Sequence, residues 1–214
     1  MRSPLEVQDA LVPIVIEKTG QGERSWDIYS RLLKERIIFI GDPIGDIGAN
    51  VIMAQLLFLQ FENRTQDINI YLNCPYLTLS AGMAIYDTMQ FVKCPIATYC
   101  IGQAVGLAAV LLAAGTPGKR YALPHARVML HQPQGYASGT TADVEIQARE
   151  IQRMKQTIHE ILARHTGKAV DKIAADIDRD FYMDAAQAKD YGLVDTVVAA
   201  AYAKGPIPQG GAKR

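Results

Sequence analysis

The run CIGQAVGLAA, residues Cys100–Ala109, marks a point where a strand-like sequence passes directly into a helix-like one. The apolar run Ile96–Ile101 precedes it, Gly102 and Gln103 form the break, and small apolar residues follow from Gly106 to Ala114. A sharp strand-to-helix turn suits a nucleophile, because the helix dipole and free N–H groups favour developing negative charge there. The residue at this turn is Gly106, which has no side chain. The sequence therefore predicts a site shaped for a nucleophile but without the reacting atom.

Strand-like and helix-like segments alternate on both sides of this turn, which favours an α/β fold with mostly parallel strands. Further strands are expected at Arg36–Ile40, Asp67–Leu72, Lys119–Leu123, Arg127–His131 and Leu193–Val198. Further helices are expected at Ser25–Leu33, from an Asp46 N-cap through Ile47, Val51, Ala54 and Phe58, and at Ala81–Phe91, Ala169–Asp176 and Asp184–Gly192. The N-terminal stretch Leu11–Glu17, followed by the glycine-containing Thr19–Gly22, is expected to be flexible.

One helix is expected to be unusually long. Thr140–Asp143 has a capping-box pattern, and Gly167 stands where a glycine would end the helix. Apolar residues recur between them at helical spacing, at Val144, Ala148, Ile151, Ile158 and Leu162. A helix of about 25 residues exceeds the usual length in a compact domain. Its apolar stripe must pack against a partner or cover the domain's own core.

Composition narrows the class of protein. The 214 residues include 22 basic and 22 acidic side chains, so the formal net charge is zero. A neutral chain gives no electrostatic indication of binding to nucleic acid or to an anionic membrane. No apolar run reaches the roughly 20 residues that span a bilayer, and the N-terminus lacks a secretion-signal core. A cytoplasmic protein is therefore expected. The three cysteines show no metal-binding or disulfide pattern, and Cys94 and Cys100 are expected to be buried thiols. His159 and His165, on the charged long helix, are expected to be solvated.

Several long runs carry a family resemblance that extends from about Leu11 to Val198. They are DIYSRLLKERIIF (Asp27–Phe39), AGMAIYDTMQ (Ala81–Gln90), LLAAG (Leu111–Gly115), KRYALP (Lys119–Pro124), RVMLHQP (Arg127–Pro133), EIQAREI (Glu145–Ile151) and DRDFYM (Asp178–Met183). The chain resembles the Clp protease proteolytic-subunit (ClpP) family. The resemblance implies the Clp/crotonase fold, an α/β fold of repeated ββα units with a long protruding handle helix. It further implies an N-terminal extension (residues 1–10), one domain (11–198) with the handle at about 134–167, and a mobile C-terminal tail (199–214).

The resemblance also implies the roles of the site residues. The family motif GQAASMG reads GQAVGLA here, which places the family's nucleophilic serine on Gly106. His131 then matches the catalytic base, and Asp180 matches the aspartate that orients it. The family's NSPGG reads Asn73-Cys74-Pro75-Tyr76-Leu77, so Leu77 and Leu107 occupy the oxyanion positions. We therefore expect no catalytic residue and a degenerate triad.

Partner contacts follow from the same resemblance. Positions that match the hydrophobic docking pockets for the Clp/Hsp100 AAA+ ATPase are Tyr71, Phe91, Ile101, Tyr121, Leu123 and Val198. Asn69 departs from the aromatic residue usual there, and Arg179 matches a residue of the ring–ring contact. No cofactor and no metal are implied. The expected partners are catalytic ClpP-type paralogues, the ATPase, and protein substrates that enter the complex, with no nucleic acid or membrane.

The leading hypothesis is a non-catalytic, ClpR-like subunit of a hetero-oligomeric, tetradecameric Clp protease core, in the cytoplasm or the plastid stroma. A second hypothesis is a peptidase whose nucleophile has moved to Cys74, Thr78, Ser80 or Cys100. A third is a crotonase-like acyl-CoA enzyme that uses backbone donors near Leu77 and the 106–107 turn.

Overall fold

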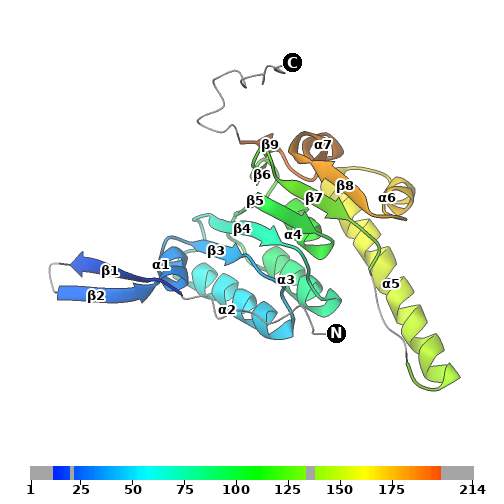
Figure 1. Ribbon diagram of the computed structural model, residues 1–214, viewed down its shortest axis with the longest axis horizontal. Coiled ribbons are helices and arrows are strands. Elements are labelled where there is room, and N and C mark those ends of the chain that lie inside the picture. The colour runs from blue at the N-terminus through cyan, green and yellow to red at the C-terminus, as the bar shows by residue number, and fades with distance from the viewer. Residues whose placement is uncertain (1–11, 20–21, 134–137, 199–214) are drawn as a thin grey trace, which may run out of the picture.

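A mostly parallel seven-stranded sheet organises the computed structural model, which describes residues 12–19, 22–133 and 138–198 (Figure 1). The main path of the sheet runs β3-β4-β5-β6-β9, with β7 paired to β5 and β8 paired antiparallel to β7. The strands are β3 (Ile37–Ile40), β4 (Ile68–Cys74), β5 (Ile96–Val105), β6 (Arg120–Ala122), β7 (Arg127–Leu130), β8 (Phe181–Asp184) and β9 (Thr196–Val197). The expected α/β class and parallel pairing are confirmed.

Helices pack on this sheet and alternate with its strands along the chain. They are α1 (Ile28–Lys34), α2 (Asp46–Glu62), α3 (Leu79–Phe91), α4 (Leu107–Ala113), α5 (Thr141–Thr166), α6 (Val170–Asp176) and α7 (Ala185–Tyr191). Helices α2, α3 and α4 lie along one face of β3, β4 and β5 (Figure 1). None of the helices in the described ranges is both long and apolar enough to cross a membrane.

Strand β5 is the central strand, since it pairs with β4, β6 and β7. Exposure alternates along its neighbour β4, where Ile68, Ile70 and Leu72 are fully buried while Asn69 and Tyr71 are half-buried. Alternation is typical of a sheet with one face in the core and the other face open. The helical layer therefore covers one side, and the tyrosine side of the sheet is more open.

A buried ion pair ties the ends of several elements together. The Arg120 guanidinium, 8% exposed, lies 2.6 Å from the Asp195 carboxylate, and this hydrogen bond holds the pKa of Asp195 below its ordinary value. The same guanidinium donates to the carbonyls of Ala113, His165 and Gly192 at 2.9–3.3 Å. These carbonyls stand at the C-terminal ends of α4, α5 and α7, where helix dipoles favour a cation. One arginine thus fixes three helix ends beside β6.

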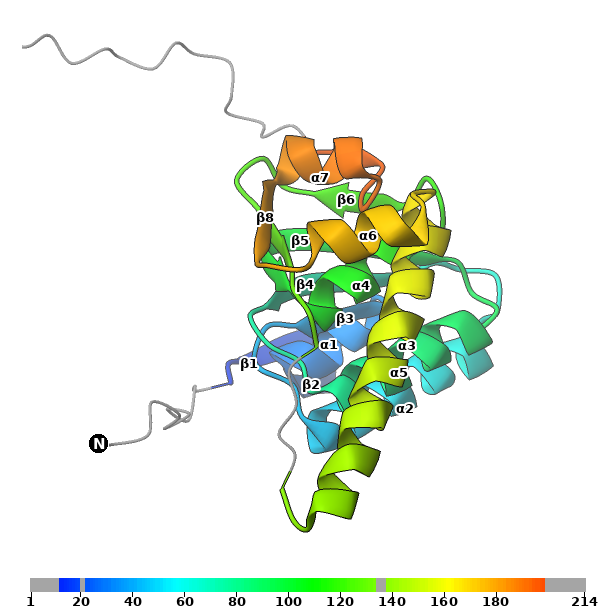
Figure 2. The same ribbon diagram turned by 90° about the vertical axis from the view of Figure 1, so that its right-hand side faces the viewer.

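Helix α5 confirms the expectation of a long helix and projects well beyond the sheet (Figures 1 and 2). It has 26 residues, a capping box at Thr140, and an αL residue, Gly167, at its end. Its buried residues lie only in its last third, at Ile158, His159, Ile161 and Leu162. The apolar positions predicted earlier in the helix, such as Val144 and Ile151, stay at least partly exposed. The projecting part therefore carries apolar side chains that the described residues do not cover.

The N-terminal segment differs from the expectation of flexibility. Strands β1 (Ile14–Thr19) and β2 (Gly22–Asp27) form an antiparallel hairpin, in which β-branched residues such as Val15 pair across to Trp26. Two cations, Arg24 and Lys34, lie 5.3 and 5.4 Å from the centroid of the Trp26 ring. The first helix therefore begins at Ile28, with Asp27 as its N-cap, rather than at Ser25. Residues 1–11 and 199–214, to which an extension and a mobile tail were assigned, lie outside the described residues.

Helix α2 is present as expected, but the residues that predicted it point outward. Its buried positions are Ala49, Ile52, Leu56 and Leu59, and its N-cap is Gly45 rather than Asp46. The predicted stripe is exposed: Ile47 is 85% exposed, Val51 54% and Phe58 56%, and Phe61 extends it at 87%. A helix that is apolar all round is normally buried on all sides. The outer face of α2 therefore presents apolar side chains that the described residues leave exposed.

The expectation that His159 and His165 are solvated was wrong. His159 is only 3% exposed, and its Nε2 has no hydrogen-bond partner within the described residues. The Nε2 of His165 lies 3.0 Å from the Tyr86 hydroxyl, and the two rings meet edge to face. Burial lowers the pKa of both histidines, and nearby cations lower it further. Both imidazoles are therefore held neutral at the base of α5.

We predict that the chain loses stability as pH falls from 7.5 to 5.5. The unfolded chain protonates histidine near its ordinary pKa of about 6.5, whereas the fold keeps these two imidazoles neutral. The contribution of these two histidines to the free energy of unfolding is therefore fully present above this pKa and declines as the pH falls below it. Paired carboxylates such as Asp195 lose their contribution only near pH 4 and below. The midpoint of chemical denaturation, measured at several pH values and fixed protein concentration, checks this.

Two variants isolate the source of that pH dependence. His159→Leu removes one buried imidazole and should flatten the dependence, whereas the change of exposed His125 to Gln should not alter it. A wild-type midpoint that stays constant between pH 7.5 and 5.5 would contradict the prediction.

Candidate functional site

The turn between β5 and α4 forms the floor of a pocket. Gly106 adopts φ 58° and ψ −116°, a conformation that side-chain-bearing residues rarely adopt. Its N–H donates to the Met129 carbonyl of β7 at 2.8 Å, and its carbonyl accepts from Ala109 N–H at 3.0 Å. The neighbouring strand and the first turn of α4 therefore fix this glycine on both sides.

The His131 ring lies against Gly106. A Cβ atom added to Gly106 would stand 2.5 Å from His131 Nε2 and 3.2–3.3 Å from two ring carbons. The imidazole thus occupies the space that a side chain at position 106 would need. The absence of that side chain lets the ring settle onto the turn.

The other nitrogen of His131 fixes its tautomer. His131 Nδ1 lies 2.6 Å from the carbonyl oxygen of Gln132, and because a carbonyl only accepts, Nδ1 carries the proton. Asp180 lines the same pocket, but within the described residues His131 makes no hydrogen bond to it. The structure therefore brings Gly106, His131 and Asp180 to one pocket without linking them in a relay.

Gln132 connects this site to two distant elements, a role that the sequence did not reveal. Its side-chain amide donates to the carbonyl and the carboxylate of Asp178 at 3.1 and 2.8 Å. Its side-chain oxygen accepts from Lys155 Nζ of α5 at 2.8 Å. The only local signal was its position after His131, since the contact with Lys155 depends on how α5 packs. Gln132 therefore bonds to His131 through its backbone carbonyl and to helix α5 through its side chain.

The two expected oxyanion positions both lie at the pocket. Leu77 forms a parallel bridge with Ile44, in which Ile44 N–H donates to Tyr76 and Thr78 N–H donates back to Ile44, both at 3.1 Å. The N–H of Leu77 therefore faces away from Ile44, and Leu77 lines the pocket with a side chain that is 6% exposed. Leu107 also lines it and packs so closely on Gly82 that a Cβ there would lie 2.6 Å from its Cδ1.

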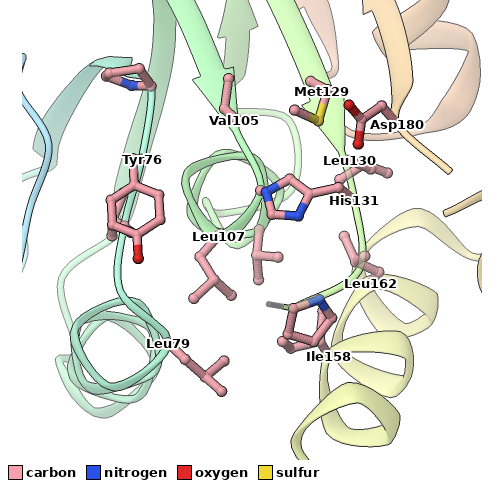
Figure 3. Close-up of a pocket in the computed structure, with 15 residues that line it drawn as sticks. Tyr76, Leu79, Val105, Leu107, Met129, Leu130, His131, Ile158, Leu162 and Asp180 are labelled. Atoms are coloured by element: carbon pink, nitrogen blue, oxygen red, sulfur yellow. The ribbon is translucent and has the colours of Figure 1, made fainter. Parts of the chain in front are cut away.

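The pocket is mostly apolar and measures about 250 Å³. Leu79, Leu107, Ile158 and Leu162 line it from three helices, and Tyr76, 54% exposed, stands across from His131 (Figure 3). A cavity of this kind suits an uncharged, apolar side chain. The titratable side chains that line it are the His131 imidazole, the Asp180 carboxylate and the Tyr76 hydroxyl.

The four candidates for a relocated nucleophile do not line this pocket. Burial raises the pKa of the Cys74 thiol to about 11 and that of Cys100 to about 12, so both stay protonated near neutral pH. All three cysteines are buried and free, as expected for Cys94 and Cys100. Thr78 caps α3, and the Ser80 hydroxyl donates to Asp46 at 2.6 Å. These groups have structural partners rather than a catalytic base.

The expected docking residues fall into two groups. Five of the six lie on the more open face or edge of the sheet: Tyr71, Ile101, Tyr121, Leu123 and Val198. Phe91 ends α3 in the helical layer and is 71% exposed, so it is not part of that surface. Tyr99, which sequence reasoning did not single out, stacks between Tyr71 and Tyr121. Arg179 is almost fully exposed, with Asp178 3.8 Å away.

Comparison with known protein families finds a match over most of the chain. A family model described as Clp protease matches residues 20–201. The chain belongs to the Clp protease family. It is therefore a ClpP-like homologue of serine peptidases, and its mixed α/β structure with a parallel sheet is consistent with the Clp protease fold. Among the described residues, no group of three or more His, Cys, Asp or Glu side chains is arranged to hold a metal ion.

We predict that Gly106→Ser alone leaves peptidase activity at least about 100-fold below that of an active Clp peptidase subunit. The new side chain would displace the His131 ring. For a triad to form, His131 Nδ1 would also have to give up its hydrogen bond to the Gln132 carbonyl and donate to Asp180 instead. Leu77 would still stand where the family has glycine. Hydrolysis of a short fluorogenic peptide by the purified full chain measures the effect.

Gly106→Ala is the matched control, because it adds the same Cβ without a hydroxyl. The two variants should have similar activity. Activity of Gly106→Ser at the level of an active subunit would contradict the reasoning from both His131 and Leu77.

Proposed function

We propose that this chain is a proteolytically inactive, ClpR-like subunit of an ATP-dependent Clp protease core. The observation that carries the proposal is the turn at Gly106, which has the conformation of a nucleophile turn, no side chain, and an imidazole lying on it. In this interpretation Gly106, His131 and Asp180 are a degenerate triad. The chain contributes walls and contacts to a chamber in which paralogous subunits cut peptide bonds.

The size of the catalytic loss supports this interpretation. Removing the nucleophile of a serine triad costs about 2 × 10⁶ in turnover. At about 1.36 kcal/mol for each factor of ten, this is roughly 8–9 kcal/mol of barrier reduction. His131 and Asp180 cannot replace it, because a base and its orienting group act only through a nucleophile or a positioned water.

Uncovered surfaces support assembly with other subunits. The outer face of α2 presents Ile47, Val51, Phe58 and Phe61, and contiguous apolar surface of this kind marks protein contacts. The projecting part of α5, with Arg179, fits the handle and ring–ring contact that the resemblance implies. Catalytic ClpP-type paralogues are the proposed neighbours in stacked rings. The setting we propose is the cytoplasm or the plastid stroma.

Docking of an Hsp100-type ATPase belongs to the same proposal. Tyr71, Tyr121, Leu123, Ile101 and Val198 gather on one side of the sheet and place an apolar surface toward the ATPase that docks on the mixed ring. Protein substrates would reach the chain only through the complex. The relocated-nucleophile hypothesis finds no support in the neutral, buried thiols, and the family match favours the protease branch over an acyl-CoA enzyme.

Co-expression with an active paralogue from the same source, followed by native mass spectrometry, tests the proposal. We expect mixed rings that contain this chain, and a fluorophosphonate probe that labels the paralogue but not this chain. The purified chain alone should not hydrolyse a fluorogenic peptide. A chain that never enters a mixed complex, or that cuts peptides alone at ordinary protease rates, would overturn the proposal.

We predict that a charge on the outer face of α2 prevents assembly without unfolding the chain. Phe58→Glu or Phe61→Glu puts a carboxylate where apolar surface would be buried, which costs several kcal/mol in a contact but little on a free monomer. Native mass spectrometry should then show at least a tenfold loss of mixed complex, with an unchanged circular dichroism spectrum. The matched control is Lys189→Glu at an exposed position of α7. Full assembly of both Phe variants would exclude α2 as the contact.

A further inference from the structure

A row of aromatic side chains crosses the more open face of the sheet. Parallel pairing sets Tyr71 opposite Tyr99, and Tyr99 opposite Tyr121, on the successive strands β4, β5 and β6. The ring centroids are 4.6 and 4.8 Å apart, and the planes deviate from parallel by only 9° and 17°. These spacings are the separation of neighbouring strands, so the sheet itself imposes the stack. Phe39 extends the row to β3 through its pairing with Tyr71.

Tyr99 is the middle member, and both faces of its ring are covered. Its hydroxyl donates to the side-chain oxygen of Asn69 at 3.4 Å, a weak bond that reaches along the neighbouring strand β4. The ring is half-buried, although no helix of the described chain packs on this side of β5. Without the Tyr99 ring, the outer two rings would stand two strand spacings apart and leave a slot wide enough for one aromatic or branched aliphatic group.

The surroundings of this slot are apolar. Leu123, 38% exposed, lies two residues after Tyr121 along the chain. Val198, 36% exposed, lies across the sheet from this segment, since its N–H donates to the Ala122 carbonyl at 2.9 Å. Ile101 follows on the same face of β5 as Tyr99. A surface with this lining would accept an apolar side chain if it had a recess. Tyr99 fills the recess and leaves ring edges and hydroxyls at the surface.

We propose that Tyr99 determines which partner loops this surface accepts: its ring excludes an inserted apolar side chain that a smaller residue at position 99 would admit. This proposal rests on the proposed function, in which the same surface faces an ATPase. In a mixed ring, an ATPase loop that ends in an apolar side chain would then select the neighbouring paralogues over this subunit. Tyr99 is thus a specificity-determining residue for docking and takes no part in peptide cleavage.

The test uses the purified full chain and two small probes, N-acetyl-phenylalaninamide and N-acetyl-leucinamide, in titrations followed by NMR. Wild type should show no saturable binding at the surface around Tyr71 and Tyr121. Tyr99→Ala and Tyr99→Val should bind the phenylalanine probe saturably, at least about tenfold more tightly than the upper limit that the wild-type titration sets, because a guest ring regains two stacking contacts. Tyr99→Val keeps a strand-favouring residue in case the alanine variant does not fold.

Two controls separate the ring from other effects. Tyr99→Phe keeps the ring but loses the hydroxyl, and it should exclude the probe as wild type does. Tyr182→Ala removes an exposed tyrosine on β8, away from the row, and should gain no binding. Saturable binding by wild type at the tyrosine row, binding gained by Tyr99→Phe, or folded small-residue variants that gain none would each overturn the proposal. Failure to assemble with a paralogue would instead overturn the proposed function and leave the probe result unchanged.

Discussion

The turn at Gly106 constrains the rest of the molecule. Strand β5 pairs with three other strands, and α4, which follows within one residue, is almost entirely buried. The chain must therefore reverse at a fixed point, and the bond from Gly106 N–H to Met129 holds that point against β7. The backbone shape is set by packing on both sides and not by the residue that stands there. Gly106 has no side chain at this fixed point, and the imidazole of His131 fills the space.

The pocket and the long helix are connected through a small number of polar contacts. His131 is held by the carbonyl of Gln132, whose side chain accepts from Lys155 on α5 and donates to Asp178. Ile158 and Leu162 of the same helix form part of the pocket wall. The part of α5 that is buried is therefore also the part that shapes the site, and the part that projects is free for other contacts. The C-terminal third of α5 thus packs in the core, and the rest of the helix projects from it.

Local patterns in the sequence predicted the alternation of strands and helices, the cap at Thr140 and the end of α5 at Gly167, because each depends on residues close together in the chain. Side-chain surroundings across the fold were harder to predict. His159 and His165 lie in a charged helix, and nothing nearby in the sequence tells which turn meets the core. The tyrosine row depends on the register of three strands that are about 20–30 residues apart. The spacing of Ile47, Val51 and Phe58 predicts helix α2 but not which of its faces is covered, because apolar periodicity alone does not distinguish a core contact from an outward face.

Helix α5 behaves mechanically as a beam fixed at one end. Its 26 residues span about 39 Å, and only the last third is embedded. A load applied at the free tip produces a torque about the embedded end, and the resisting force falls on the Ile158–Leu162 packing and on the Arg120 clamp at His165. Because Arg120 also donates to carbonyls at the C-terminal ends of α4 and α7, a bending force on α5 would be transmitted to both of these helices.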